Sequence, residues 1–92
     1  MSELRDFDVA NYLDNKKIIA EYLTQILQDG DVEELIGAID DITRAKGISS
    51  IAKDTNLNRE SLYKAFKKGS KPRFDTVLKV LNALDIKLAA VY

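Results

Sequence analysis

The sequence contains no cysteine and no histidine. Without cysteine there is no disulfide framework and no thiolate metal site, and without histidine the commonest general base and metal ligand is missing. Most familiar catalytic sites are thereby excluded, and no cofactor is expected. The neighbouring carboxylates Asp40 and Asp41 leave one enzymatic alternative, a water-mediated Mg²⁺ site. Adjacent helix residues diverge by about 100°, however, and no nucleophile stands beside a base, so the chain is not expected to be an enzyme.

Long apolar runs are also missing. No stretch approaches the roughly 18 apolar residues that a membrane span needs, and the first six residues lack the basic and apolar regions of a secretory signal. The chain is therefore expected to stay in the cytoplasm. Its 92 residues suit one domain with one small core. A chain of this size buries only roughly 60 to 65% of its unfolded surface, so a partner subunit would stabilise it.

Charge is distributed unevenly, although the net charge is only −1. Residues 1–43 contain eleven acids and three bases, whereas residues 44–73 contain two acids and nine bases. An uneven but merely solvated surface is one explanation of this pattern. The other explanation is that the basic segment binds a partner of high negative charge. The secondary structure of the basic segment distinguishes these two explanations.

Apolar residues that recur at three- and four-residue spacing predict amphipathic helices. The first helix is expected over residues 15–28, with Asp14 as its N-cap. The second is expected to follow Asp31, with Glu34 at the capping-box position, and to stop at Gly47.

Two shorter helices are expected next, joined by a tight turn at residues 56–58. Ser49 or Ser50 is expected to cap the first of them, and Asn58 the second, which ends before Gly69. This pair predicts a helix-turn-helix over about residues 49–68.

The residues of this pair have the types that a helix-turn-helix needs. Ala52 is small where two steeply crossing helices nearly touch, Asn56 tolerates left-handed backbone angles in the turn, and Leu57 fills the space beneath it. Leu62 and Phe66 share the side of the second helix that is expected to pack, with Ala65. The opposite side carries Glu60, Tyr63, Lys64 and Lys67. The structural alternative is that the two helices belong to an ordinary helical bundle.

The two ends of the chain have different patterns. The single proline, Pro72, separates the basic pair from a last amphipathic helix that starts near Phe74, and the helical domain is expected over residues 14–85. Residues 86–92 alternate roughly and are apolar, which predicts a short C-terminal β-strand. Residues 1–13 lack a clean period and are expected to form an N-terminal extended arm.

Four blocks of the sequence resemble a known family: "YLDNKKIIAEYL", "GDVEEL", "RAKGISSIAKDTNLNRESLYKAF" and "GSKPRFDTVLKVLNALDIKL". They are similar to addiction-module antidote proteins (antitoxins) of the HigA-like group, within the lambda-repressor-like, Xre-type helix-turn-helix family. The sequence departs from that family at Asn56, Ser70 and Asp85, where Gly, Asn and Gly are more usual.

The resemblance implies a five-helix all-α fold of a bacterial or prophage-encoded protein. It also implies a homodimer that binds double-stranded DNA at its own operator and represses its own operon. The implied partner is a RelE/ParE-like toxin, which the antidote would neutralise by direct binding.

Candidate site residues follow from the helix-turn-helix. Base edges in the major groove are expected to be read by the start of its second helix: Asn58, Arg59, Glu60, Ser61 and Lys64. Several of these residues have a purely structural alternative, since Asn58 can simply cap the helix and Glu60 can pair with Lys64. Phosphate contacts are expected from Ser49, Ser50, Lys53, Tyr63, Lys67, Lys68, Lys71 and Arg73.

The acidic half and the tail suggest protein contacts. Because toxins of the implied class are basic, toxin binding is expected from the acidic and apolar residues of the arm: Glu3, Asp6, Phe7, Asp8, Tyr12 and Leu13. Dimerisation is expected through the tail residues Ile86, Leu88, Ala90 and Tyr92. A prophage-type repressor without a toxin and a purely protein-binding helical module remain the alternative functions.

Overall fold

A computed structural model describes residues 16–92 of the chain. These residues form five α-helices: α1 (Lys16–Asp29), α2 (Val32–Lys46), α3 (Ile48–Thr55), α4 (Arg59–Ala65) and α5 (Phe74–Ala83). The all-α prediction is confirmed for this part of the chain. None of its helices is long and apolar enough to cross a lipid bilayer.

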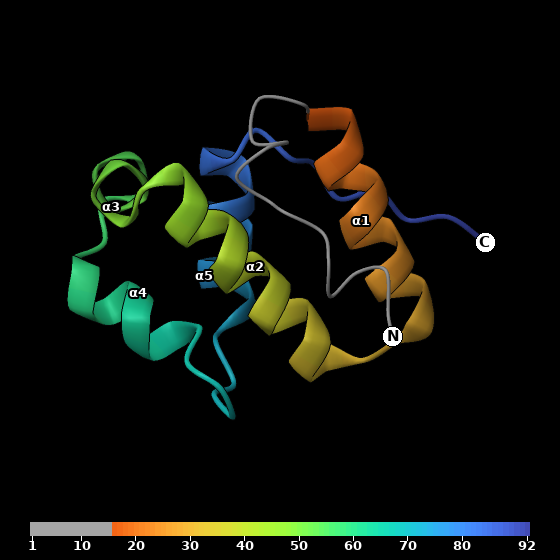
Figure 1. The fold of residues 1–92 in the computed structure, drawn as a ribbon, viewed down its shortest axis with the longest axis horizontal. Helices are drawn as coiled ribbons and strands as arrows, with labels where there is room; N and C mark the ends of the chain where they lie inside the picture. The colour runs from red at the N-terminus through yellow and green to blue at the C-terminus, as the bar shows by residue number, and fades with distance from the viewer. Residues whose placement is uncertain (1–15) are drawn as a thin grey trace.

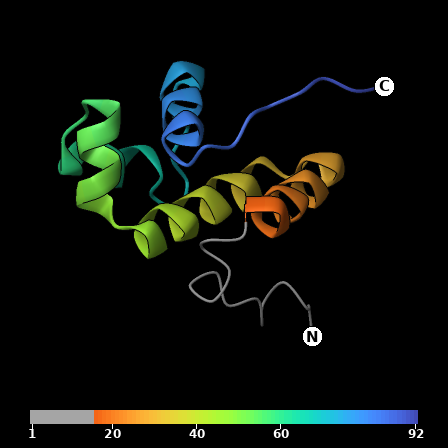
Figure 2. The same ribbon diagram turned by 90° about the horizontal axis from the view of Figure 1, so that it is seen from above.

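α2 lies in the middle of the arrangement (Figure 1). α1 packs on one end of it and α3 on the other, while α3 also contacts both α4 and α5. α1 and α4 consequently lie at opposite ends of the molecule in both views (Figures 1 and 2). Every helix contributes to one core, whose fully buried members include Ile26, Ile39, Ile42, Ile51, Leu62 and Val80. Burial of a side chain of this size stabilises a fold by about 1.5 to 3 kcal/mol.

The ends of α2 are fixed by the residues that the sequence predicts. The Asp31 Oδ1 atom accepts a hydrogen bond from the Glu34 backbone N–H at 3.0 Å. Gly47 ends the helix with φ 117°, and its N–H donates to the Thr43 carbonyl oxygen at 3.0 Å. Both predictions are confirmed, because each depends only on residues within one helical turn.

The prediction that Ser49 or Ser50 caps the next helix is wrong. α3 begins at Ile48, its N-cap is Gly47, and no side chain caps it. Gly47 ends α2 and starts α3 at the same position, and its carbonyl oxygen accepts from the Ile51 N–H at 3.1 Å. This shared residue leaves no linker in which a serine cap could stand, so both serines lie exposed in the first turn of α3.

Residues 84–92 follow α5 without a strand. The Ile86 N–H donates to the Leu81 carbonyl oxygen at 2.9 Å, and the Ile86 side chain is buried. Beyond Ile86 the tail passes beside α1 and extends outward to the C-terminal end (Figure 2). The strand expected over residues 86–92 is thus not found in the described chain, since a strand requires a neighbouring strand to bond with and residues 16–92 provide none.

Candidate nucleic-acid interface

The turn between α3 and α4 is built by the backbone of three residues. Asn56 has φ 60° and ψ 27°, the left-handed conformation that asparagine tolerates better than most residues. The Leu57 N–H then donates to the Ala52 carbonyl oxygen at 3.2 Å. Asn56 therefore provides the turn geometry for which glycine is usual.

A buried threonine supports the same turn from inside. The Thr55 hydroxyl donates a hydrogen bond to the Ile51 carbonyl oxygen at 2.7 Å. The Thr55 Oγ1 atom also accepts a hydrogen bond from the Leu57 N–H at 3.3 Å. Thr55 is 9% exposed. The turn is thus held by backbone and side-chain hydrogen bonds together, which fixes the direction in which α4 leaves it.

α4 has one packed side. Its N-cap is Asn58, whose Oδ1 atom accepts from the Ser61 N–H at 2.7 Å. Leu62 is 1% exposed, and Phe66, directly after the helix, is 2% exposed. The prediction that these two residues anchor the helix is confirmed.

The opposite side of α4 faces solvent. It presents three exposed polar or charged residues, Glu60, Ser61 and Lys64, and Arg59 is exposed at the first position of the helix. The structure therefore brings together the residues expected to read bases. Asn58 is exposed as well, but its carbonyl oxygen is engaged in the cap.

The loop after α4 holds further cations. Gly69 has φ 84°, the Ser70 N–H donates to the Lys67 carbonyl oxygen at 2.9 Å, and the Ser70 hydroxyl donates to the Lys64 carbonyl oxygen at 2.8 Å. The hydroxyl thus caps the carboxyl end of α4. The side chains that this loop presents to solvent are Lys67, Lys68, Lys71 and Arg73.

Arg73 is the loop cation with an ionic partner. Its Nε atom lies 3.2 Å from the Asp75 Oδ1 atom, and both side chains are largely exposed. A surface ion pair of this kind is worth little, so it leaves the guanidinium available to a phosphate. Ser49, Ser50 and Lys53 are also exposed, on α3.

Arg44 is a member of this surface that sequence reasoning missed. Its guanidinium lies 4.9 Å from the centroid of the Tyr63 ring, and its Nε atom donates to the Asp40 Oδ2 atom at 2.9 Å. The hydrogen bond to Asp40, and then the charge of that carboxylate, raise the pKa of Arg44. Tyr63 is half-buried, so its ring is covered from the α2 side. The contact joins residues 19 positions apart in the sequence, so local patterns do not predict it. The local sequence shows only that Arg44 is a basic residue in the last turn of α2.

The two carboxylates of α2 are accounted for without a metal. Asp40 accepts from Arg44, and partial burial followed by the charge of Asp40 raises the pKa of Asp41. Among residues 16–92, no group of three or more His, Cys, Asp or Glu side chains is placed to hold a metal ion.

Opposite ends of the described chain carry opposite charge. Residues 16–43 contain two bases and seven acids, whereas residues 44–73 contain nine bases and two acids. The acidic segment is α1 with most of α2, and the basic segment is α3, α4 and the following loop. α3 and α4, which belong to the basic segment, lie at the end of the molecule away from α1 (Figure 1).

These features describe a small helical protein with a cationic two-helix surface. The family model described as "Probable addiction module antidote protein" matches residues 3–92, and the chain belongs to this family. A Haemophilus influenzae protein named "Uncharacterized protein" is 44% identical over 85 residues, which cover 92% of this chain and 88% of that protein. No solved structure matches the chain significantly.

Some expected site residues lie outside the described residues. They are the proposed toxin contacts Glu3, Asp6, Phe7, Asp8, Tyr12 and Leu13, together with the Asp14 cap. Of the expected dimer contacts, Ile86 packs into the chain's own core, whereas Leu88, Ala90 and Tyr92 are exposed.

Proposed function

We propose that this antidote protein binds double-stranded DNA through a helix-turn-helix of the lambda-repressor-like, Xre-type class, made of α3, the turn and α4. The observation that carries the proposal is the two-sidedness of α4. Leu62 and Phe66 fix one side in the core, the other side offers Glu60 and Lys64 to solvent, and Arg59 is exposed at the start of the helix. A major groove admits an α-helix of this kind, and its phosphates attract the surrounding cations.

The base-reading roles are divided by hydrogen-bonding capacity. Arg59 can donate to guanine O6 and N7 together, and Glu60 can accept from cytosine N4. Ser61 and Lys64 lie on the same exposed surface of α4. Asn58 is the weakest reader, because a two-point contact with adenine needs the carbonyl oxygen that already accepts from Ser61.

The phosphate roles belong to the periphery of α4. Lys53 of α3 and the loop residues Lys67, Lys68, Lys71 and Arg73 are exposed next to α4 in the chain, and the first turn of α3 presents Ser49 and Ser50. Tyr63 is oriented by Arg44 and is suited to a sugar or phosphate at the margin. These contacts position the protein, whereas the base contacts select the sequence.

The proposed protein partner is a RelE/ParE-like toxin, neutralised by direct binding. The acidic charge of residues 1–43 suits a basic partner and disfavours DNA, so toxin and duplex would engage opposite ends of the molecule. In this proposal two copies bind one operator, with their α4 helices about 34 Å apart in successive turns of the groove, and thereby repress the operon. The family description favours this antidote over a prophage-type repressor that has no toxin.

Four alanine variants test the division of roles on α4 and its loop. Lys67→Ala and Arg73→Ala are expected to weaken binding to operator and random duplex alike and to lower the salt slope by about one ion each. Glu60→Ala and Lys64→Ala are expected to change the preferred base at one position, by about 1 to 3 kcal/mol of discrimination. Binding is measured by fluorescence anisotropy on duplex from upstream of the gene and on a scrambled duplex.

The matched control is Lys17→Ala, which removes an exposed lysine from α1 at the far end of the molecule. It is expected to change neither affinity nor base preference. Equal losses on both duplexes for all four test variants would remove the base-reading assignment.

The toxin role is tested with the gene encoded beside this one. Co-expression of both chains is expected to give a stable complex, and deletion of residues 1–13 is expected to weaken it without changing duplex binding. Full-strength complex formation by the deletion variant would overturn the role of the arm. Failure of the complete chain to bind the neighbouring product would leave the prophage-type repressor as the better account.

A further inference from the structure

Exposed large apolar side chains among residues 16–92 gather in two places. Leu27, Val32, Phe74 and Leu88 line one groove, and Val91 and Tyr92 lie in the tail. Side chains of this size are normally scattered singly on a surface, so their concentration in a groove and a tail marks an interaction site.

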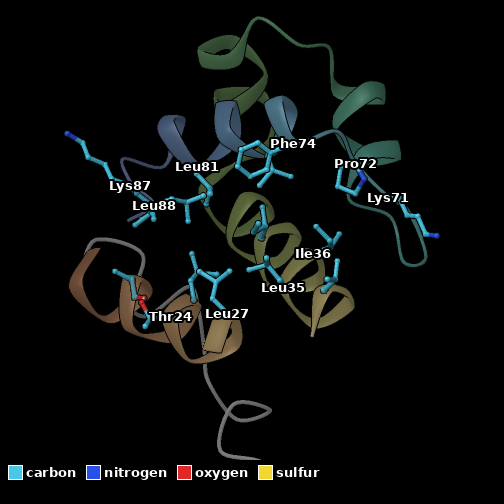
Figure 3. Close-up of a pocket in the computed structure, with 16 residues that line it drawn as sticks. Thr24, Leu27, Leu35, Ile36, Lys71, Pro72, Phe74, Leu81, Lys87 and Leu88 are labelled. Carbon is cyan, nitrogen blue, oxygen red and sulfur yellow. The ribbon is translucent and has the colours of Figure 1, made fainter. Parts of the chain in front are cut away.

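The groove lies between α1, α2 and α5 and has a volume of about 600 Å³. Figure 3 shows Leu27 of α1, Leu35 of α2 and Leu81 of α5 directed toward the same space. Its wall is almost entirely apolar, because the helices that meet here turn their leucine, isoleucine and valine residues toward it. An extended apolar segment is the kind of ligand that such a groove can hold.

The charged residues beside the groove indicate which kind of segment can bind in it. Among residues 16–92, no Asp or Glu lines the groove, and the two charged lining residues are Lys71 and Lys87. They lie at opposite ends of the groove with their side chains directed away from it (Figure 3). A basic toxin segment would meet these cations without a compensating carboxylate, whereas a neutral apolar segment meets no repulsion.

The tail of this same chain is such a segment. Ile86 is fixed by its hydrogen bond to Leu81, and Leu88 lies at the edge of the groove. From there the sequence Leu88-Ala-Ala-Val-Tyr92 contains no charged side chain and is exposed throughout. Lys87 and Leu88 line the chain's own groove and the next residues pass beside α1, yet Val91 and Tyr92 are 85% and 122% exposed, so their own chain leaves these two apolar side chains uncovered.

We infer that residues 88–92 of a second copy occupy the groove between α1, α2 and α5, and that the two copies exchange tails reciprocally. This inference rests on the proposed function, in which two copies bind one operator, and identifies the surface that joins them. Each tail leaves its own chain at the edge of the groove. A two-fold axis close to that edge brings each tail to the groove of the other copy, so the exchange is reciprocal.

A second hollow provides room for this arrangement. It has a volume of about 710 Å³ and lies between α1 and the chain's own tail, lined by Gln28, Ala89, Ala90 and Val91. It shares Thr24, Leu27, Lys87 and Leu88 with the groove, so the two hollows are continuous. The incoming tail can therefore lie in the groove while running beside the tail that leaves.

Crosslinking between differently substituted chains tests the exchange. The natural chain has no cysteine, so Leu27→Cys in one copy and Val91→Cys in an ¹⁵N-labelled copy supply the reactive groups for a short bismaleimide. After the two proteins are mixed, the mixed-isotope dimer is expected as the main crosslinked product. Gln25→Cys is the matched control, because Gln25 is exposed on the same helix but lines neither hollow, and it should give at least ~10-fold less product.

A charge in the groove provides the second measurement. Leu27→Glu at an exposed position of α1 is expected to raise the dimer dissociation constant at least ~10-fold in sedimentation velocity, since the glutamate would have to be buried beneath the tail. Gln25→Glu adds the same charge outside the groove and is expected to leave that constant unchanged. Circular dichroism of both variants checks that each remains folded.

Three outcomes would overturn the inference. They are a monomeric unsubstituted chain at all concentrations, no mixed dimer from the Leu27→Cys and Val91→Cys pair, and a crosslink formed only within one chain that carries both substitutions. The inference would also be overturned if added toxin protected the cysteine of Leu27→Cys from modification without displacing a tail, because the groove would then be the toxin's binding site. Duplex binding at several salt concentrations is measured on the same samples. If salt-dependent binding persists while the exchange fails, the inference is overturned but the proposed function is not, because a helix-turn-helix can still contact a half-site without the exchange.

Discussion

The α3–α4 surface and the groove between α1, α2 and α5 share one core but expose opposite chemistry. On α4 the apolar residues are buried, and what remains outside is polar and cationic. At the groove Leu27, Val32 and Phe74 stay exposed, and no carboxylate of the described part of the chain lines it. One small core thus supports a surface suited to phosphate and bases and another suited to an apolar protein segment. The two surfaces should therefore respond to different substitutions.

The largest effect is expected where the two surfaces depend on the same core. Leu62→Ala removes a 1% exposed side chain from α4 and should lower the free energy of unfolding by about 2 to 5 kcal/mol. In a domain of this size that loss threatens both surfaces together. Denaturant unfolding followed by circular dichroism measures it.

Phe74→Ala is the comparison for that prediction, because Phe74 is 68% exposed at the groove. It should cost much less stability than Leu62→Ala. Equal costs at concentrations where the chain is monomeric would show that the chain itself covers Phe74 and would contradict the contrast between core and groove.

A substitution on α2 should raise stability. The Thr43 side chain is 1% exposed, and its Oγ1 atom has no hydrogen-bond partner among the described residues. A buried hydroxyl without a partner costs about 1 to 3 kcal/mol, so Thr43→Val is expected to stabilise the fold by about 1 kcal/mol. The melting temperature by differential scanning fluorimetry should rise while duplex binding stays constant. A lower melting temperature would show that the hydroxyl does have a partner.

The turn of the α3–α4 surface offers a matched pair of substitutions. Asn56→Ala places alanine at φ 60° and is expected to cost about 1 kcal/mol, whereas Asn56→Gly should be neutral or slightly stabilising. Both are measured by thermal unfolding and by duplex binding. A neutral Asn56→Ala would contradict the left-handed turn.

The smallest effect is expected at the ion pair of Lys16 with Asp85, which joins the start of α1 to the end of α5. The hydrogen bond and the charge of Lys16 lower the pKa of Asp85. A carboxyl group with a lowered folded-state pKa adds stability above its unfolded pKa, and this contribution is lost as the pH falls through the folded value. Asp85→Asn keeps a side chain that tolerates φ 61° and should remove only this acid-dependent part. Identical pH profiles of the two melting temperatures would show that the pair contributes nothing.

The parts of the fold that the sequence predicted are those that depend on near neighbours. The caps at Asp31 and Asn58 and the stop at Gly47 each involve one helical turn, and apolar spacing identified the buried side of α4. The serine cap failed because α2 and α3 share Gly47, a detail of backbone geometry that periodicity does not contain.

The features that the sequence did not reveal depend on elements distant in the chain. Arg44 meets Tyr63 only because the fold brings the end of α2 near α4, and the groove exists only because three helices converge around it. Phe74 belongs to an apolar stripe of α5 yet remains exposed, since its position lies at the groove instead of in the core. The predicted strand likewise depends on a neighbour that local sequence cannot supply. The division into arm, helical domain and tail stays a prediction.

The salt dependence of duplex binding tests the central claim most directly. The unsubstituted chain is titrated onto duplex from upstream of its gene across a range of NaCl concentrations. The logarithm of the association constant is expected to fall linearly with the logarithm of salt concentration, with a slope of several ions, because the α4 surface displaces counterions from phosphates. An affinity that does not change with salt would contradict the assignment of that surface to DNA.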